Sequence, residues 1–458
     1  MQFGILALHP RLAFAQGGQN VLCIGQVQRA FGSQPQAAGG THEQAQVQFA
    51  FQPRHRCGHL ARQQIGLARG LREAAQRSGT DEQLQIVETD HFHCCSESVD
   101  RFCAFLPLCA RRTLWPLLIG SPPMRAIAYT HAGLPIDDPQ ALIDLDLPVP
   151  QPGPRDLRVA VRAVAVNPVD TKVRRGAATD GPRVLGWDAV GVVDAVGSEV
   201  TLFRPGDAVY YAGVIDRPGS NAEYQLVDER SVGRKPASLD DAAAAALPLT
   251  AITAWELLFD RLRIGEGGGD GQTLLVIGAA GGVGSILVQL ARRLTKLTVI
   301  GTASRPETQD WVQAMGAHHV IDHTRPLAEG LARLGITEVD HVASLTHTDQ
   351  HYAQIVELLA PQGQLGLIDD PGQIDVMALK RKALSLHWES MFTRPLYRTA
   401  DMQRQHDLLN RVAELVDAGV LQTTLGEHFG RIDAANLRRA HALLESHRAK
   451  GKIVLEGW

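Results

Sequence analysis

The sequence has 458 residues, more than one ordinary core holds, which points to two or three domains. Its formal net charge is −4 and it has no long run of Lys or Arg, so it lacks the electrostatic signature of a nucleic-acid or anionic-membrane partner. All six cysteines lie before Met124. Because the rest of the chain needs no oxidising compartment, we expect a cytoplasmic protein that acts on small molecules.

The residues before Met124 differ in composition from the rest. They contain no Lys and no Tyr, and the Gln-rich stretch 34–52 offers too little apolar surface to offset the entropy of ordering. We interpret 1–123 as a non-native or disordered N-terminal extension, with a real appended domain as the alternative. Its leader-like start and its apolar run 102–119, broken by two arginines, predict neither a signal peptide nor a membrane span.

From Met124 to residue 250 the pattern predicts a compact, barrel-like β domain. Met124 follows the helix-breaking Ser121-Pro122-Pro123 and opens a strand, and turns containing Pro and Gly separate further β-type runs. These expected strands are 157–166, 189–196, 208–211 and 224–227. Helical spacing then begins near Asp240 and continues to Leu262.

Beyond a glycine-rich connector, apolar strands alternate with amphipathic helices. Such alternation is typical of an α/β fold, a doubly wound parallel sheet with both faces covered. We assign 251–385 to this domain and 386–458 to a return onto the first one. The expected strands are 273–277, 297–301, 319–321, 341–344 and 364–368, and the expected helices are 285–294, 307–315 and 352–359, followed by helix 400–418 and strand 452–455.

The strand at 273–277 leads directly into a glycine-rich turn that opens the next helix. Glycines there permit a sharp turn, close approach of the backbone to a pyrophosphate and tight helix–strand packing, while the helix N-terminus supplies free amides. This context predicts a dinucleotide site. Its residues are Gly278, Ala279, Ala280, Gly281, Gly282, Val283 and Gly284, with Ala279 replacing the first glycine of the strict G-x-G-x-x-G pattern.

The residues after the next expected strand indicate which dinucleotide binds. NAD is usually held by an acidic side chain about 20 residues after the glycines. This chain has Thr302-Ala303-Ser304-Arg305 instead. The hydroxyl of Ser304 and the guanidinium of Arg305 suit a 2′-phosphate, which a carboxylate would repel. The predicted cofactor is therefore NADPH, the alternative being that both residues belong to a solvated loop.

The order of these motifs resembles the medium-chain dehydrogenase/reductase superfamily over essentially all of Met124–Trp458. Several segments are similar to its quinone oxidoreductase branch, among them Asn167–Asp170, Gly186–Asp188 and Ala280–Gly284. Others look like its zinc-type alcohol dehydrogenase-like subgroup: Gly219–Tyr224, Ser344–His351 and His387–Arg394. The resemblance implies a GroES-like β-barrel domain, a Rossmann domain and a homodimer formed through the Rossmann domain.

The zinc in the subgroup's name conflicts with the residues at the expected site. Zinc members carry Cys where this chain has Asn167, and His-Glu where it has Trp187-Asp188, so only Asp188 is a ligand type. A catalytic zinc needs three protein ligands, and a structural zinc in such enzymes needs four cysteines. No cysteine follows Cys109, and we expect no metal site.

By the same resemblance, Asn167 and Thr253 would line the nicotinamide and substrate pocket, and Asp170 would orient the local loop. Each of these positions also has a structural interpretation. Asn167 sets a turn before Pro168, Thr253 bonds within a helical turn, and Asp188 caps the segment that follows it.

Further resemblances place residues around the cofactor. His323 would lie against the adenine, with a surface histidine as the alternative. Leu345 and Ile368 follow later strands, and open α/β sheets bind ligands at that carboxyl edge. Met391 and Phe392 would form a nicotinamide-side wall or pack in the core.

These features predict an enzyme, an NADPH-dependent reductase of a quinone, enone or related carbonyl without catalytic zinc. Hydride transfer to such an acceptor needs chiefly alignment and a polar group near the oxygen. Two alternatives stay open: an alcohol dehydrogenase with a non-standard metal site around Asp188, and a non-catalytic NADPH-binding module whose partner binds 1–123. Neither the acceptor nor the proton donor follows from the sequence.

Overall fold

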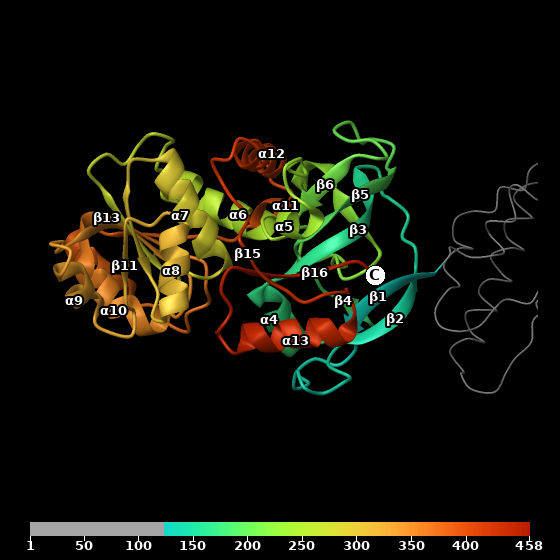
Figure 1. Cartoon of the computed structure of the whole chain (residues 1–458), viewed down its shortest axis with the longest axis horizontal. Coiled ribbons are helices and arrows are strands. Elements are labelled where there is room, and N and C mark those ends of the chain that lie inside the picture. Colours follow the sequence, from blue (N-terminus) through green and yellow to red (C-terminus); the bar gives the residue numbers. More distant parts are fainter. Residues whose placement is uncertain (1–122) are drawn as a thin grey trace, which may run out of the picture. The chain divides into compact units, whose positions relative to one another are not determined.

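The computed structural model describes residues 123–458, so the expectations for the residues before Pro123 lie outside the described part. Two lobes make up this part (Figure 1). One is rich in β-strands and contains both the first and the last strand of the described chain. The other is an α/β lobe formed by the segment between them, so the chain leaves the first lobe, builds the second and returns.

The β lobe contains a small antiparallel sheet and a larger, mainly antiparallel sheet in which β15 and β16 pair in parallel. In the smaller one, β1 (Pro123–Tyr129) lies between β2 (Ile143–Pro148) and β4 (Arg183–Val184). The larger sheet has the order β15-β16-β3-β5-β6-β8, with β7 paired to β3. Its strands are β3 (Asp156–Val166), β5 (Ala189–Val196), β6 (Ala208–Tyr211), β7 (Tyr224–Asp228), β8 (Val232–Arg234), β15 (Leu425–His428) and β16 (Lys452–Glu456). The expected barrel-like β domain is confirmed.

Alternation along these strands explains the core of the β lobe. In β3, Leu157, Val159 and Val161 are buried while the residues between them are partly exposed, as period-two side-chain geometry requires. The terminal strand β16 pairs with β3, with Ile453 opposite Val166. The last strand of the described chain therefore belongs to the same sheet as β3.

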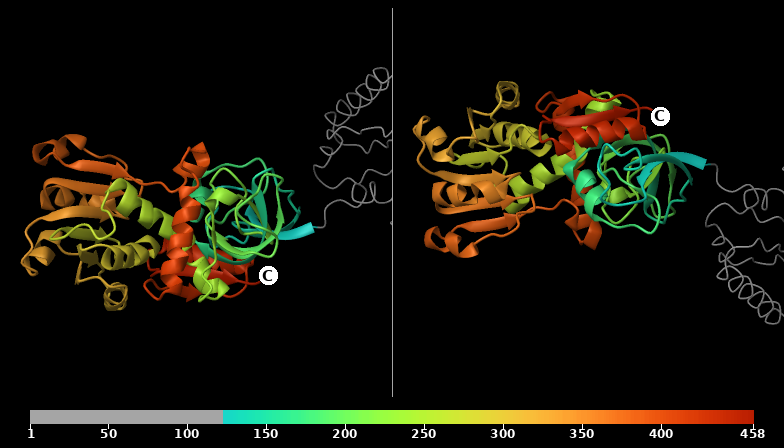
Figure 2. Two further views of the ribbon diagram at one scale, coloured as in Figure 1. Left: turned by 90° about the horizontal axis from the view of Figure 1, so that it is seen from above. Right: turned by 90° about the horizontal axis from the view of Figure 1, so that it is seen from below.

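The α/β lobe is a six-stranded parallel sheet in the order β11-β10-β9-β12-β13-β14. The strands are β9 (Thr273–Ile277), β10 (Thr298–Thr302), β11 (His319–Ile321), β12 (Val339–Ser344), β13 (Leu359–Leu367) and β14 (Ser385–Trp388), so the expected division between 385 and 386 falls inside the last strand. Helices α7 (Gly282–Leu294), α8 (Pro306–Ala314), α9 (Leu327–Ala332) and α10 (Thr348–Leu358) connect them. Figure 2 shows helices on both sides of this sheet.

Burial on both faces accounts for the continuous apolar runs. In β9, Leu274 and Val276 belong to one hydrophobic cluster, and Leu275 and Ile277 belong to another. Because successive side chains point to opposite faces, both faces of this strand need apolar residues. The predicted doubly wound fold is confirmed.

Helices join the two lobes. The stretch expected to be helical between Asp240 and Leu262 forms α5 (Asp241–Ala245), α6 (Pro248–Trp255) and a π-helical turn η3 (Glu256–Arg261), because Pro248 starts a new helix rather than continuing the first. Asp240 caps α5 by accepting a hydrogen bond from the amide of Ala243 at 2.7 Å. Returning toward the β lobe, the chain forms α11 (Thr393–Tyr397) and α12 (Arg404–Asp417).

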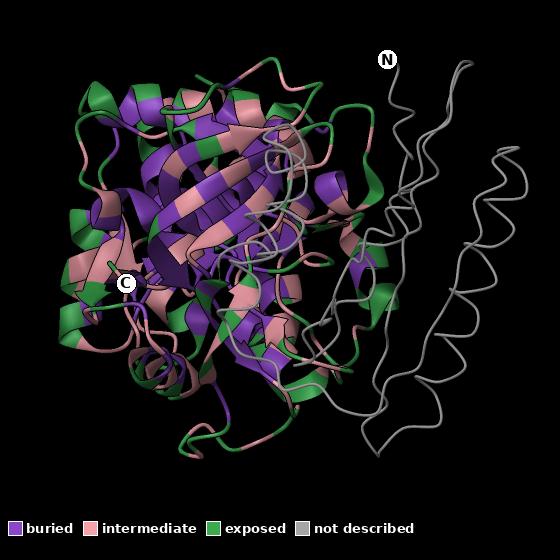
Figure 3. Cartoon of the chain, turned by 90° about the vertical axis from the view of Figure 1, so that its right-hand side faces the viewer, coloured by how far each residue is buried: buried purple, intermediate pink, exposed green. Residues whose placement is uncertain are grey.

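Two further helices, α4 (Pro168–Gly176) and α13 (Ala434–Glu445), lie together at the β lobe (Figure 1). The sequence patterns did not single them out. They meet through an ion pair in which the buried Arg174 donates to the partly exposed Glu445 at 2.6 Å. Figure 3 shows the buried residues gathered along the sheets, with exposed residues on the outer turns and helix faces.

Within 123–458, one stretch, Asp241–Arg261, is long and apolar enough to cross a membrane. In the structure, 89% of its most apolar window is buried inside the protein. Its hydrophobic side chains therefore belong to the core between the lobes.

Candidate active site

The glycine-rich loop turns tightly between β9 and α7. Gly278 has a φ of 81°, a conformation that L side chains rarely adopt, and a Cβ there would lie 2.8 Å from the Thr346 methyl carbon. A Cβ on Gly284 would lie 2.5 Å from the Gly278 carbonyl oxygen and 2.6 Å from that of Ala279. The loop closes on itself only because these positions lack side chains, which leaves the start of α7 free to receive a phosphate.

The other predicted cofactor residues reach the same edge of the sheet. Ser304, His323, Leu345 and Ile368 each follow a parallel strand, β10, β11, β12 and β13 respectively. Since parallel strands end at a common edge, these residues gather beside the glycine-rich loop. Backbone bonds tie this edge together, for example from the amide of Leu345 to the carbonyl of Ile277 at 3.2 Å.

Arg305 stands where the two lobes approach each other. Its Nε lies 2.9 Å from Glu307 Oε1, and its Nη2 donates to the Arg448 carbonyl at 2.9 Å. The ammonium of Lys450 lies 5.4 Å from the Trp311 ring. The return segment therefore contacts Arg305 and the helix that follows it, α8.

Histidine rings line the same edge. The His323 and His351 rings lie 6.3 Å apart, and burial lowers the pKa of both. Across the lobes, the His347 and His447 rings lie 5.3 Å apart, and both residues have positive φ angles. The neutral His323 ring is chemically suited to stack on a base.

A buried polar network lies where zinc members of the superfamily carry their ligands. The Asn167 amide donates to Asp188 Oδ2 at 2.9 Å, and Lys452 Nζ donates to Asn167 Oδ1 at 2.5 Å and to Asp188 Oδ2 at 2.6 Å. All three side chains are at least 97% buried. The second Asp188 oxygen accepts from the Leu249 amide at 2.7 Å, so this carboxylate also fixes the first turn of α6.

This network touches the glycine-rich loop. The Lys452 Cδ lies only 2.8 Å from where a Cβ of Gly282 would be, and the amide of Gly451 donates to the Ala280 carbonyl at 2.8 Å. The ammonium therefore lies close to the N-terminus of α7. Burial raises the pKa of Asp188, and the ion pair with Lys452 opposes that rise.

Asp170 is buried beside this network. Its Oδ2 accepts a hydrogen bond from the backbone N–H of Asn167 at 2.7 Å, while its Oδ1 has no hydrogen-bond partner among residues 123–458. Burial raises its pKa to about 7, against the hydrogen bond from Asn167. The bond from Asn167 to Asp170 fixes the first turn of α4.

Thr253 lies in α6, and its hydroxyl donates to the Leu249 carbonyl at 2.8 Å.

Met391 is 3% exposed, and the Phe392 ring meets Trp187 edge-on at 6.1 Å. The structure therefore brings the return segment against the residue next to Asp188.

The residues present do not fit a zinc site. In 123–458 no group of three or more His, Cys, Asp or Glu side chains comes together in a metal-binding arrangement. Asn167 and Trp187 are not zinc ligands, and both Asp188 oxygens are already engaged, by Lys452 and by Leu249. An ammonium supplies the positive charge that this carboxylate would otherwise take from a metal.

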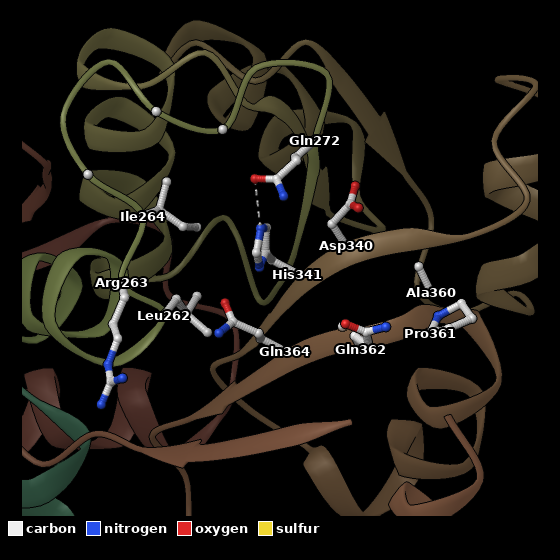
Figure 4. Close-up of a pocket in the computed structure, with 14 residues that line it drawn as sticks. Leu262, Arg263, Ile264, Gln272, Asp340, His341, Ala360, Pro361, Gln362 and Gln364 are labelled. Atoms are coloured by element: carbon white, nitrogen blue, oxygen red, sulfur yellow. Dashed lines mark hydrogen bonds between the residues drawn. The ribbon is translucent and has the colours of Figure 1, made fainter. Parts of the chain in front are cut away.

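A hollow of about 620 Å³ lies at the opposite edge of the α/β sheet. In Figure 4, His341 sits between Gln272 and Gln364, with its Nε2 3.4 Å from Gln272 Oε1. Ligands of open α/β sheets bind at the carboxyl ends of strands, and this hollow is at the amino ends. It takes no part in the candidate site.

Sequence reasoning missed Lys452 as a site residue. The sequence predicts only that it opens the terminal strand 452–455 and gives no signal of its buried partners. Its partners Asn167 and Asp188 lie far away in sequence, so only the tertiary structure pairs them.

Comparison with known proteins agrees with this architecture. The family model "Alcohol dehydrogenase GroES-like domain" matches 153–237, and "Zinc-binding dehydrogenase" matches 315–455. A zinc-type alcohol dehydrogenase-like protein of Staphylococcus aureus (strain MSSA476) is 43% identical over 312 residues, 67% of this chain and 92% of that protein. A 2-methylene-furan-3-one reductase of Solanum lycopersicum is 38% identical over 220 residues, 45% of this chain and 54% of that one.

Solved structures extend the comparison. A Rhizobium etli CFN 42 protein assigned to the zinc-dependent alcohol dehydrogenases is 57% identical, with a TM-score of 0.71 over 74% of this chain and 99% of that one. The Coxiella burnetii quinone oxidoreductase is 26% identical, with a TM-score of 0.61 over 74% and 100%. A mycobacterial protein complexed with NADPH is 26% identical, with a TM-score of 0.63 over 73% and 100%.

The fold, the glycine-rich loop and these relatives define the class of protein. The chain belongs to the medium-chain dehydrogenase/reductase superfamily of nicotinamide-dependent oxidoreductases, within its zinc-type alcohol dehydrogenase-like group.

The buried ion pair predicts a specific pattern of stability. Lys452→Met leaves the Asp188 carboxylate buried without a cation, which should cost about 3–5 kcal/mol of unfolding free energy. Adding Asp188→Asn removes the unpaired charge and should restore much of that loss. Urea unfolding of the two single variants and the double variant measures the coupling. Equal stability of Lys452→Met and the unmodified protein would contradict the assigned pair.

Proposed function

We propose that this protein is an NADPH-dependent reductase of a quinone, an activated enone or a related carbonyl, and that it works without catalytic zinc. The observation that carries the proposal is the replacement of the zinc ligands by Asn167, Trp187 and an Asp188 already paired with Lys452. A quinone oxidoreductase and a furanone reductase among the relatives support the acceptor class.

The chemistry of the acceptor fits such a site. The bound cofactor supplies a hydride at its nicotinamide ring, and a conjugated acceptor spreads the resulting negative charge without a Lewis acid. What the protein has to supply is alignment and polar groups near the acceptor oxygen. The Asn167 amide and the Lys452 ammonium provide dipole and charge beside the glycine-rich loop.

Asp170 is a candidate source of the proton that completes the reduction. Burial raises the pKa of Asp170 to about 7, which suits proton exchange near neutral pH. Thr253 would help to hold the nicotinamide end, and the Met391–Phe392 segment would form the wall on the acceptor side.

A turnover assay on the full-length chain tests this function. NADPH oxidation should accelerate with 1,4-benzoquinone or 3-penten-2-one and should be unchanged after treatment with 1,10-phenanthroline, because no bound metal takes part. Elemental analysis of the same sample serves as the control. One zinc per chain together with chelator-sensitive alcohol oxidation would replace this proposal by a metal-dependent alcohol dehydrogenase.

We further infer that NADPH is preferred over NADH. The three residues directly after β10, Ala303, Ser304 and Arg305, include no acid, and the first acidic residue, Glu307, lies on α8 and pairs with Arg305. The Arg305 guanidinium is about one-third exposed and bonds only to Glu307 and a carbonyl, so a phosphate can compete for it. The NADPH complex of a relative is consistent with this preference.

Arg305→Ala tests the assignment of the phosphate site. Removing one charge-assisted hydrogen bond should weaken NADPH binding about tenfold, while NADH binding stays nearly unchanged because NADH lacks the 2′-phosphate. Isothermal titration calorimetry measures both affinities. Arg293→Ala, an exposed arginine on α7, is the matched control and should alter neither. Equal losses for both cofactors would refute the phosphate role.

We also propose a homodimer formed through the α/β lobe. Strand β14 is the last strand of the six-stranded sheet, so its outer edge offers unpaired backbone groups. Trp388 on this strand is 52% exposed, and Val376 and Met377 nearby in sequence are also exposed. An isologous pairing of two such edges would cover both the backbone and the apolar side chains.

Trp388→Glu should separate the dimer, because it would place two carboxylates in the interface without cations. Light scattering coupled to size-exclusion chromatography should then give half the molar mass of the unmodified protein. Tyr397→Glu, at a 74% exposed position outside this strand, should leave the mass unchanged. A monomeric unmodified protein would rule the interface out.

A further inference from the structure

A second buried charged cluster lies where the chain passes from the α/β lobe back to the β lobe. It joins the π-helical turn η3, the end of β14, α11 and α12. Glu256 is fully buried, Glu389 is 4% exposed and Gln405 is fully buried. π-helical turns occur frequently at functional sites, and nothing in the proposed chemistry uses this cluster.

The inner members of the cluster are tightly connected. Arg394 Nη1 lies 2.6 Å from Glu256 Oε1, and Arg261 Nε lies 2.7 Å from Glu389 Oε2. Arg261 also reaches Glu256 Oε2 at 3.7 Å, so one guanidinium contacts both carboxyl groups. The Gln405 amide donates to Glu256 Oε1 at 3.3 Å and to the Met391 carbonyl at 2.7 Å.

The cluster holds more acids than bases. Beyond the two inner carboxyl groups, Asp260 and Asp401 also contact Arg394, at 2.9 and 3.0 Å, and Arg404 contacts Asp260 at 2.7 Å. The acidic members are Glu256, Glu389, Asp260 and Asp401, and the basic members are Arg261, Arg394 and Arg404. Of the remaining titratable groups, His387 on β14 is kept neutral because burial lowers its pKa.

The excess of acidic over basic groups leaves carboxyl oxygens without hydrogen-bond donors. Within the described residues, Glu256 Oε2 and Glu389 Oε1 are both buried without a hydrogen-bond donor. Two neighbouring carboxyl groups that each lack a donor satisfy one another when one of them keeps its proton. Burial, followed by the charge of Glu256, raises the pKa of Glu389 to about 9, which agrees with a retained proton.

The cluster also fixes the segment that borders the candidate site. Glu389–Arg394, which we call the crossover segment, links β14 to α11. It is held at one end by the Glu389 amide bond to the Leu367 carbonyl at 2.8 Å, and in the middle by the bond from Gln405. Its Phe392 ring packs edge-on against Trp187, the neighbour of Asp188.

We propose that Glu256 and Glu389 share one proton and act as a positioning pair that holds the crossover segment against the acceptor side of the active site. The acceptor-side role rests on the proposed function, whereas the shared proton does not. Loss of the proton adds a buried negative charge to a cluster already rich in carboxylates, which loosens the segment and its contact with Trp187.

Glu389→Gln tests the proposal with little change of shape, because the amide can donate to Glu256 at every pH. In the folded protein the proton leaves Glu389 near pH 9, whereas in the unfolded chain it leaves near 4.5. The native state therefore loses stability as pH rises from about 4.5 to 9, and the loss levels off above 9. The melting temperature of Glu389→Gln should exceed that of the unmodified protein by a margin that grows over this range.

Two further measurements report on the segment itself. Hydrogen-exchange protection of the Met391 and Phe392 amides, corrected for intrinsic exchange, should fall about tenfold from pH 7 to 10 in the unmodified protein and stay constant in Glu389→Gln. For 1,4-benzoquinone, KM should rise over the same range with a smaller change in kcat, and Glu389→Gln should abolish that rise. Glu266→Gln, a half-exposed carboxylate paired only with Arg411, is the matched control.

A second variant, Glu256→Gln, distinguishes proton sharing from a purely structural role. Glu256→Gln also removes the excess carboxylate and should abolish the pH step, but it deprives Arg394 of its 2.6 Å partner and should destabilise the protein at every pH. A Glu389→Gln protein with the same pH dependence of stability and protection as the unmodified chain overturns the proposal. If the protein turns over no acceptor, the KM measurement and the proposed function both fail. The pH dependence of the melting temperature and of the hydrogen-exchange protection then decides the proposal.

Discussion

The ammonium of Lys452 is the constraint on which the site depends. It is buried with Asp188 and Asn167, and a buried carboxylate without a cation is costly enough to threaten the fold. Because Asp188 also accepts from the Leu249 amide, the same ion pair fixes the helix that joins the lobes. The last strand of the chain thereby controls the geometry of residues contributed by its first domain.

This arrangement explains how a chain of the zinc-type group is built without the ligands its name implies. A positive charge is present at the expected place, but it belongs to a side chain and is fixed in position. A fixed ammonium orients the Asn167 amide, but it offers no open coordination position for an alkoxide as a catalytic metal does. The reaction that we propose, hydride transfer to a conjugated acceptor, does not require such a position.

Two buried charged clusters lie at the junction of the lobes, and they differ in charge balance and in the residues they hold. The Lys452 cluster is balanced, with one cation for the carboxylate it contacts, and lies beside the glycine-rich loop. The Glu256 cluster has an excess of carboxylates and lies behind the crossover segment. The Lys452 cluster therefore holds its neighbours in a fixed geometry. The Glu256 cluster holds the crossover segment with a strength that depends on a single proton.

Local patterns determined the fold class, the two domains and the position of the glycine-rich loop. They could do so because side-chain periodicity and glycine geometry are properties of short segments, as Gly278 and Gly284 demonstrate. The helices α4 and α13 were missed although each carries a local start signal, Pro168 after Asn167 in α4 and the N-cap Asp433 in α13, and the contact of Arg174 with Glu445 joins them across the chain. Only the tertiary structure paired Lys452 with Asn167 and Glu256 with Glu389, because Coulomb interactions and burial depend on distance in space and not on separation along the chain.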